Sequence, residues 1–86
     1  MENIIEQAKL LWQCRRGMLE LDLFLVPFAK KHYASQSEEQ QKNFRNLLTY
    51  PDPDLFAWLM GHESPEDPEL IEIVQLVKRL HKPTPL

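Results

Sequence analysis

The chain has 86 residues, enough for one domain with a single modest core. Its formal net charge of −3 disfavours a protein whose main work is to bind nucleic-acid phosphates. A hydrophobic share of 43% and a charged share of 27% are typical of a globular domain rather than a disordered chain. Cys14 is the only cysteine, which excludes an intrachain disulfide.

The start of the chain and its most apolar stretch argue against export and membrane insertion. Met1-Glu2-Asn3 lacks the basic region of a secretory signal. The most apolar stretch, residues 23–29, is far shorter than the roughly 20 residues of a membrane-spanning helix. We therefore expect a soluble, cytoplasmic protein in a reducing compartment, with no membrane insertion.

The first predicted helix covers residues 2–15. Its apolar residues recur at helical spacing and form one stripe: Ile4, Ala8, Leu11 and Trp12. We expect Trp12, like Trp58 further along, to pack in the core rather than to form a ligand-stacking pair. Cys14 lies at the apolar-rich end of this helix, where a buried, unreactive thiol is the commoner case. A nucleophilic pair of Cys14 with a histidine is the alternative.

The second predicted helix covers residues 18–33. One stripe consists of Leu21, Phe24, Leu25 and Phe28, but further leucines and a valine make the helix apolar almost all round. Such a helix is usually central. Because Pro27 lacks a backbone donor and clashes with the preceding turn, we expect a kink there.

Capping signals predict three further helices. Ser37 and Gln40 have the spacing of a capping box, which opens a third helix to about residue 48. The sequences Asp52-Pro53-Asp54-Leu55 and Asp67-Pro68-Glu69-Leu70 each place a capping aspartate before a proline at the first helical position. The fourth helix ends at Gly61, a left-handed cap, and the fifth reaches about residue 81.

The inward residues of these later helices follow from the same periodicity. They are Phe44, Leu47 and Leu48 in the third helix, and Leu70, Ile73, Val74, Val77 and Leu80 in the fifth. No stretch has the alternation of a strand. The predicted fold class is all-α, a compact single-domain bundle of about five helices over residues 1–82, with a frayed tail at 83–86.

No arrangement of residues typical of catalysis or metal binding is evident in the sequence. His32, His62 and His81 lack the spacing of metal ligands, and no second cysteine could join them. There is also no glycine-rich phosphate loop. We therefore expect no catalytic residue, no bound metal and no tightly bound cofactor, which favours a binding protein over an enzyme.

The segment between the first two helices carries a concentration of charge. Local structure accounts for each residue type: Gly17 can take a positive φ, the arginines complement the first helix's negative end, and Glu20 falls in the next helix's first turn. In addition, guanidinium and carboxylate groups around a residue without a side chain would let another protein's backbone approach closely. The predicted partner-binding site consists of Arg15, Arg16, Gly17, Met18, Glu20 and Asp22.

Three stretches together point to a known family. The first contains an R-G-x-x-E signature at Arg16, Gly17 and Glu20, and the second is Pro27-Phe28 with Tyr33 downstream. The third, residues 52–59, reads D-P-D-L-F-A-W-L and is similar to a family segment D-P-D-L-x-x-W-L. In this order they resemble the SdhE-type FAD assembly factors, which include the succinate dehydrogenase assembly factors of mitochondria.

The resemblance implies a five-helix protein that binds the flavoprotein subunit of succinate dehydrogenase, and often that of fumarate reductase. It would promote covalent attachment of FAD to a histidine of that subunit. The chemistry would reside in the flavoprotein, while this chain would favour a competent arrangement of its domains. We expect a monomer, with a homodimer left open. The alternative is an antitoxin-like protein that neutralises a toxin by direct binding, since relatives have carried that label.

Overall fold

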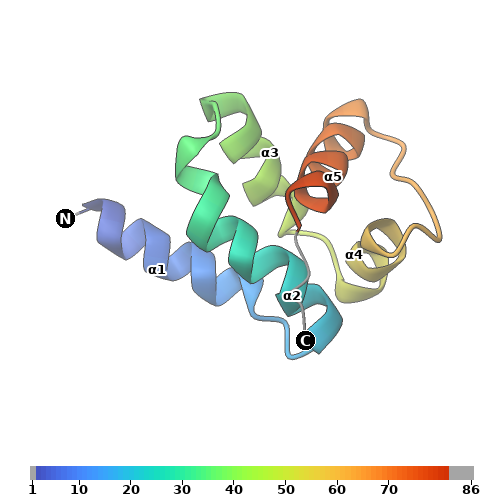
Figure 1. Ribbon diagram of the computed structural model, residues 1–86, viewed down its shortest axis with the longest axis horizontal. Coiled ribbons are helices and arrows are strands. Elements are labelled where there is room, and N and C mark those ends of the chain that lie inside the picture. The colour runs from blue at the N-terminus through green and yellow to red at the C-terminus, as the bar shows by residue number, and fades with distance from the viewer. Residues whose placement is uncertain (1, 82–86) are drawn as a thin grey trace.

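The computed structural model describes residues 2–81, with side chains from residue 8 onward. The described chain forms five α-helices and no strand (Figure 1). The helices are α1 (Glu2–Cys14), α2 (Leu19–Pro27), α3 (Glu38–Leu47), α4 (Asp52–Leu59) and α5 (Pro68–Leu80). The predicted all-α fold class is confirmed. The predicted tail at 83–86 lies outside the described residues.

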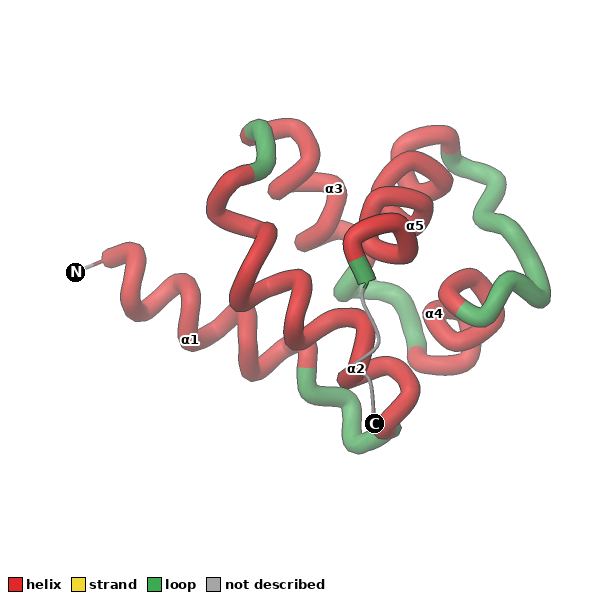
Figure 2. Tube along the Cα trace, viewed as in Figure 1, coloured by secondary structure: helices red, strands yellow, loops and turns green. Residues whose placement is uncertain are grey.

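Two helices organise the bundle. α2 packs against α1, α4 and α5, and α5 also contacts α3 and α4. Figure 2 shows short connections on either side of α3 and a longer loop that leads from α4 to α5. None of the described helices combines the length and apolar character needed to cross a lipid bilayer.

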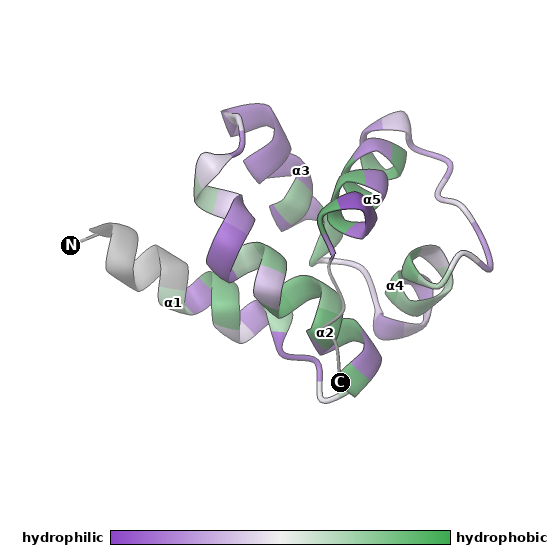
Figure 3. Cartoon of the chain, viewed as in Figure 1, coloured by the Kyte–Doolittle hydropathy of each residue, from purple (hydrophilic) through white to green (hydrophobic). Residues whose placement is uncertain are grey.

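One buried cluster joins all five helices. Its helical members are Leu10 and Cys14 in α1, Leu21 and Leu25 in α2, Phe44 and Leu47 in α3, Leu55 and Leu59 in α4, and Leu70, Ile73, Val74 and Val77 in α5. Figure 3 shows that α2 is apolar along most of its length, whereas α3 is mostly hydrophilic. The inward residues predicted for the third and fifth helices are confirmed, except that Leu80 is only half-buried.

The face that α1 buries is not the predicted one. Leu10 and Cys14, one turn apart, lie in the core, whereas Ala8 is exposed, Leu11 is half-buried and Trp12 is 78% exposed. The predicted stripe was therefore wrong at Ala8 and Trp12, whereas Leu11 packs against the core; Ile4 falls outside the residues with described side chains. Apolar residues at the three consecutive positions 10–12 lie on more than one side of this helix, and packing against α2 buries the side with Leu10.

The two tryptophans differ in their surroundings. The prediction of a core position was wrong for Trp12. Trp58 is half-buried and packs edge-on against Tyr50, with ring centroids 5.2 Å apart. This contact supports a packing role for Trp58.

The α-helical hydrogen-bonding pattern ends at Pro27. Its φ of −61° and ψ of −37° keep the chain helical, but Phe28–His32 forms a π-helical turn and Tyr33–Ser35 a 3₁₀ turn. Because proline has no N–H to donate, the regular ladder is interrupted there, and the Tyr33 N–H bonds to the Phe28 carbonyl in the wider π pattern. The helix predicted over 18–33 is thus three successive helical segments.

The predicted caps are confirmed at two of three helix starts. The Ser37 hydroxyl accepts from the Gln40 N–H at 3.2 Å, and the Asp67 carboxylate accepts from the Glu69 N–H at 2.9 Å. Asp52 was wrongly predicted to be a cap. Pro51 occupies the capping position of α4, and Asp52 is its first helical residue, which leaves the carboxylate available for another partner.

Candidate functional site

The turn between α1 and α2 is closed by backbone hydrogen bonds. The Arg15 N–H donates to the Trp12 carbonyl at 3.2 Å, and the Asp22 N–H donates to the Met18 carbonyl at 3.0 Å as α2 begins. Between them, Gly17 has a φ of +77°, in the left-handed region that favours glycine. The positive φ predicted for Gly17 is therefore confirmed.

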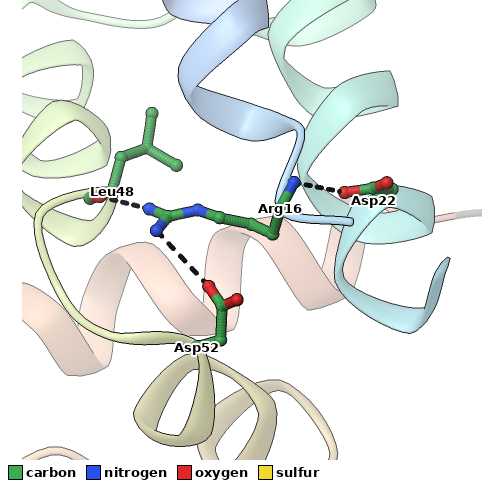
Figure 4. Close-up of polar contacts among 4 residues, drawn as sticks. All are labelled: Arg16, Asp22, Leu48 and Asp52. Atoms are coloured by element: carbon green, nitrogen blue, oxygen red, sulfur yellow. Dashed lines mark hydrogen bonds and ion pairs between the residues drawn. The ribbon is translucent and has the colours of Figure 1, made fainter. Parts of the chain in front are cut away.

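The Asp22 carboxylate fixes the backbone of this turn. Its Oδ1 accepts a hydrogen bond from the backbone N–H of Arg16 at 2.9 Å (Figure 4). Asp22 lies in the first turn of α2, where the positive end of the helix dipole also favours a negative charge. This half-buried side chain therefore has a structural partner inside the chain.

The Arg16 side chain crosses to the junction between α3 and α4. Its Nη1 lies 3.4 Å from Asp52 Oδ1, and its Nη2 donates to the Leu48 carbonyl (Figure 4). Its Nε is buried and has no hydrogen-bond partner among the described residues. Only 18% of the side chain is exposed, so most of Arg16 serves internal contacts.

This placement corrects the predicted role of Arg16 at the end of the first helix. Leu48 follows directly after α3, so the guanidinium complements the negative end of α3 rather than that of α1. Asp52 begins α4, where its negative charge faces the positive end of that helix. Both partners lie more than 30 positions along the chain, and no local pattern in the sequence reveals them.

Three of the six predicted site residues face solvent: Arg15, Gly17 and Glu20. A Cβ atom added to Gly17 would meet nothing within 4 Å, so the glycine leaves open backbone surface. Met18 is half-buried and packs against the core. The predicted site therefore divides into an exposed part and a part that shapes the turn, namely Arg16, Met18 and Asp22.

Exposed apolar residues that the site prediction did not include lie next to this turn. Leu19 is 68% exposed and Leu23, one turn further along α2, is 52% exposed. Leu23 also lines a shallow hollow with Arg15, Asp22, Val26 and Pro27. The apolar character of α2 all round is typical of a central helix, and the exposure of Leu19 and Leu23 departs from that expectation.

Cys14 is fully buried beneath the turn. Burial raises the pKa of its thiol from 9.0 to about 12, and the positive charge of Arg16 only partly opposes this rise. Because the thiolate is the nucleophilic form, a protonated thiol at neutral pH argues against a Cys14-based catalyst. Among the described residues, no group of three or more His, Cys, Asp or Glu side chains could hold a metal ion.

Comparison with known proteins identifies relatives of this chain. Residues 8–81 match the protein family described as flavinator of succinate dehydrogenase. The FAD assembly factor SdhE of Legionella pneumophila (strain Lens) is 56% identical over 73 residues, which are 85% of this chain and 91% of that protein. The protein of the same name from Idiomarina loihiensis is 50% identical over 76 residues, 88% of this chain and 84% of that protein.

A more distant relative extends the match. The FAD assembly factor SdhE of Photorhabdus laumondii is 45% identical over 80 residues, 93% of this chain and 91% of that protein. These matches include the turn between α1 and α2 and the segment that begins α4. The chain therefore belongs to the family of succinate dehydrogenase flavinators, the SdhE-type FAD assembly factors.

Proposed function

We propose that this chain binds the flavoprotein subunit of succinate dehydrogenase and promotes its covalent attachment of FAD. The observation that carries the proposal is the exposure of Gly17 and Glu20, two residues of the R-G-x-x-E signature, in a chain of the FAD assembly factor family. The bond-forming chemistry belongs to the flavoprotein. This chain contributes binding energy that favours a competent arrangement of the flavoprotein's domains, a role that needs no catalytic residue.

The docking site in this proposal consists of Arg15, Arg16, Gly17, Met18, Glu20 and Asp22. The exposed Glu20 carboxylate accepts hydrogen bonds from donors of the flavoprotein, and the Arg15 guanidinium binds its carboxylates or carbonyls. Gly17 lets the partner's backbone approach, because the space beside its Cα is open. Arg16, Met18 and Asp22 hold the turn in shape through their internal contacts.

Leu19 and Leu23 add an apolar part to the same docking site. Both are exposed on α2 beside the charged turn. Interfaces combine a dehydrated apolar centre, which contributes affinity, with charged groups that set orientation and partner choice. We therefore expect these two leucines to become buried when the flavoprotein binds.

The proposal also covers a second partner, the cellular compartment, the oligomeric state and the affinity for FAD. The flavoprotein of fumarate reductase is a second proposed partner, as the resemblance to the family implies. We propose that the chain acts in the cytoplasm as a monomer and binds no FAD tightly. Light scattering of the purified chain tests the monomer, and equilibrium dialysis against FAD tests the absence of tight binding.

Co-expression with the flavoprotein tests the proposed function. Covalently bound flavin is measured by in-gel fluorescence, with and without this chain. Glu20→Ala is expected to lower flavin attachment strongly with little change in folding, because Glu20 is exposed. Glu39→Ala is the matched control, since Glu39 is also an exposed acid in the first turn of a helix, α3.

Two contrary results have different meanings. If the wild-type chain does not increase flavin attachment, the proposed function is wrong. Wild-type attachment with Glu20→Ala would leave the function in place but remove Glu20 from the docking site.

A further inference from the structure

Arg16 belongs to the R-G-x-x-E signature, yet its guanidinium points into the molecule. The backbone N–H of Arg16 is held by Asp22, and the side chain is held by Asp52 and the Leu48 carbonyl (Figure 4). One residue thus connects the turn before α2 with the junction between α3 and α4. Neither aspartate is part of the signature.

Asp52 constrains the guanidinium in a way that the Leu48 carbonyl alone does not. A guanidinium is planar, and contacts through two different nitrogens fix the orientation of that plane. The Nη1–Oδ1 distance of 3.4 Å pairs the positive charge with the only carboxylate that forms an ion pair in the described part of the chain. Without that carboxylate, the side chain would keep one neutral acceptor and could turn toward solvent.

The contacts that Arg16 makes with Asp52 and the Leu48 carbonyl, here called the tether, begin next to the docking site. Arg16 directly precedes Gly17, whose open backbone is the surface assigned to close approach, and Glu20 follows in the first turn of α2. A tether from Arg16 to the start of α4 therefore sets the orientation of this turn relative to the rest of the bundle.

We propose that Asp52 is a positioning residue of the docking site and acts through Arg16. It holds Gly17 and Glu20 in the orientation that the flavoprotein meets, without contacting the flavoprotein itself. This inference rests on the proposed function and adds to the site a residue 36 positions away from Arg16. In this account, the arginine of the signature works by shaping the turn, whereas Gly17 and Glu20 make the contacts.

Asp52→Asn tests the proposal, with Asp54→Asn as the matched control. Each change removes one negative charge from the first turn of α4, but only Asp52 pairs with Arg16. We expect Asp52→Asn to weaken binding to the purified flavoprotein subunit by roughly tenfold, a size typical of coupling between contacting residues. Asp54→Asn should bind as wild type, and Asp52→Glu, which keeps the carboxylate, should recover most of the affinity.

A double-mutant cycle separates positioning from direct contact. Arg16→Gln is expected to weaken binding alone but to add little in the Asp52→Asn background, because the charge pairing that orients the guanidinium is already lost there. Losses that add in full would mean that Arg16 meets the flavoprotein independently of Asp52, which overturns the proposal. Wild-type affinity in Asp52→Asn would overturn it too. The affinity of each variant for the flavoprotein is measured by calorimetric titration, at a temperature at which every variant is folded.

The free protein provides a second readout that does not depend on the partner. In NMR spectra, Asp52→Asn is expected to shift the backbone amide resonances of Gly17 and Glu20, and Asp54→Asn to leave them in place. Unmoved resonances at both positions in Asp52→Asn would overturn the positioning role even if binding fell. If the wild-type chain has no affinity for the flavoprotein, the proposed function fails, whereas the amide shifts still decide whether Asp52 sets the turn.

Discussion

At the scale of single residues, Gly17 and Gly61 have the same backbone geometry in different surroundings. Their φ angles are +77° and +80°. A Cβ at Gly17 would meet open space, and one at Gly61 would lie 3.7 Å from Lys78 Nζ, an ordinary contact. Alanine at either position therefore suffers backbone strain without a clash, which makes Gly61 a control for Gly17.

Gly17→Ala and Gly61→Ala are expected to lower the free energy of unfolding by similar amounts, about 1 kcal/mol for an L-residue held in the left-handed region. Only Gly17→Ala should lower flavin attachment, because only there does the new methyl group occupy the docking surface. Urea unfolding and in-gel flavin fluorescence measure the two effects. Equal flavin attachment by both variants would show that no partner approaches Gly17 closely.

The buried Cys14 thiol is expected to make the fold sensitive to alkaline pH. Its pKa is about 12 in the folded state and 9.0 as an ordinary value, so between these values the folded state holds more protons. The contribution of the thiol to stability is therefore complete below pH 9.0 and is lost as the pH rises toward 12. The slope is about 1.4 kcal/mol per pH unit at most.

Comparison with Cys14→Ala isolates this effect from the titration of lysines and tyrosines. The free energy of unfolding of the wild type should fall more steeply than that of Cys14→Ala above about pH 9, the range where the unfolded thiol ionises. Parallel curves would mean that the thiol titrates normally in the folded chain. Flavin attachment at neutral pH should survive the substitution, since the thiol is protonated and enclosed.

Residue-scale features could be predicted where their causes are local. The positive φ of Gly17 and the acid in the first turn of α2 follow from neighbouring residues, and the structure confirms both. The partners of Arg16 could not be predicted, because Leu48 and Asp52 come close only when α3 and α4 pack near the turn. Asp52 is not the cap that its local pattern indicates, because Pro51 occupies the capping position, and the Asp52 carboxylate pairs with Arg16 instead.

At the scale of helices, a capping pattern depends on neighbouring residues alone, whereas the face that a helix buries also depends on the elements that pack against it. The starts of α3 and α5 follow Ser37 and Asp67 as expected, because a cap depends on two or three residues. The buried face of α1 depends on which neighbour covers it, and the sequence has apolar residues on two sides. The π-helical turn after Pro27 could not be predicted either, because apolar periodicity distinguishes a helix from other structure but not one type of helix from another.

Asp67 provides a test of capping in α5. Asp67→Ala removes the acceptor of the Glu69 N–H and is expected to lower the free energy of unfolding by about 1 kcal/mol. Asp67→Asn keeps an acceptor of the same length and should stay within a few tenths of a kcal/mol of the wild type. Denaturant unfolding measures both. A loss in Asp67→Asn equal to that in Asp67→Ala would assign the effect to charge rather than to the cap.

At the scale of the whole molecule, the buried cluster and the docking site depend on each other. Leu21 and Leu25 place α2 in the core, and the same helix presents Glu20, Leu19 and Leu23 to solvent. α5 completes the core through contacts with α2, α3 and α4, although it carries none of the docking residues. Changes in α5 should therefore alter how much folded protein exists rather than how well each folded molecule docks.

Ile73 tests this separation, because it is fully buried in α5. Ile73→Ala is expected to lower the free energy of unfolding by about 3 kcal/mol, and Ile73→Val by about 1 kcal/mol. Since a domain of this size has a total stability of roughly 4–13 kcal/mol, the alanine variant should unfold at a clearly lower temperature. Its flavin attachment in cells should fall with the amount of folded protein as growth temperature rises.

The purified variants separate abundance from docking. At a temperature where circular dichroism shows Ile73→Ala to be folded, its affinity for the flavoprotein should equal that of the wild type, because the turn at Gly17 keeps its contacts with Asp22 and Asp52. Weaker binding by the folded variant would contradict the separation. It would mean that a change in the packing of α5 against α2 and α4 alters the geometry of the docking site. The change would act through the start of α4, which holds Arg16.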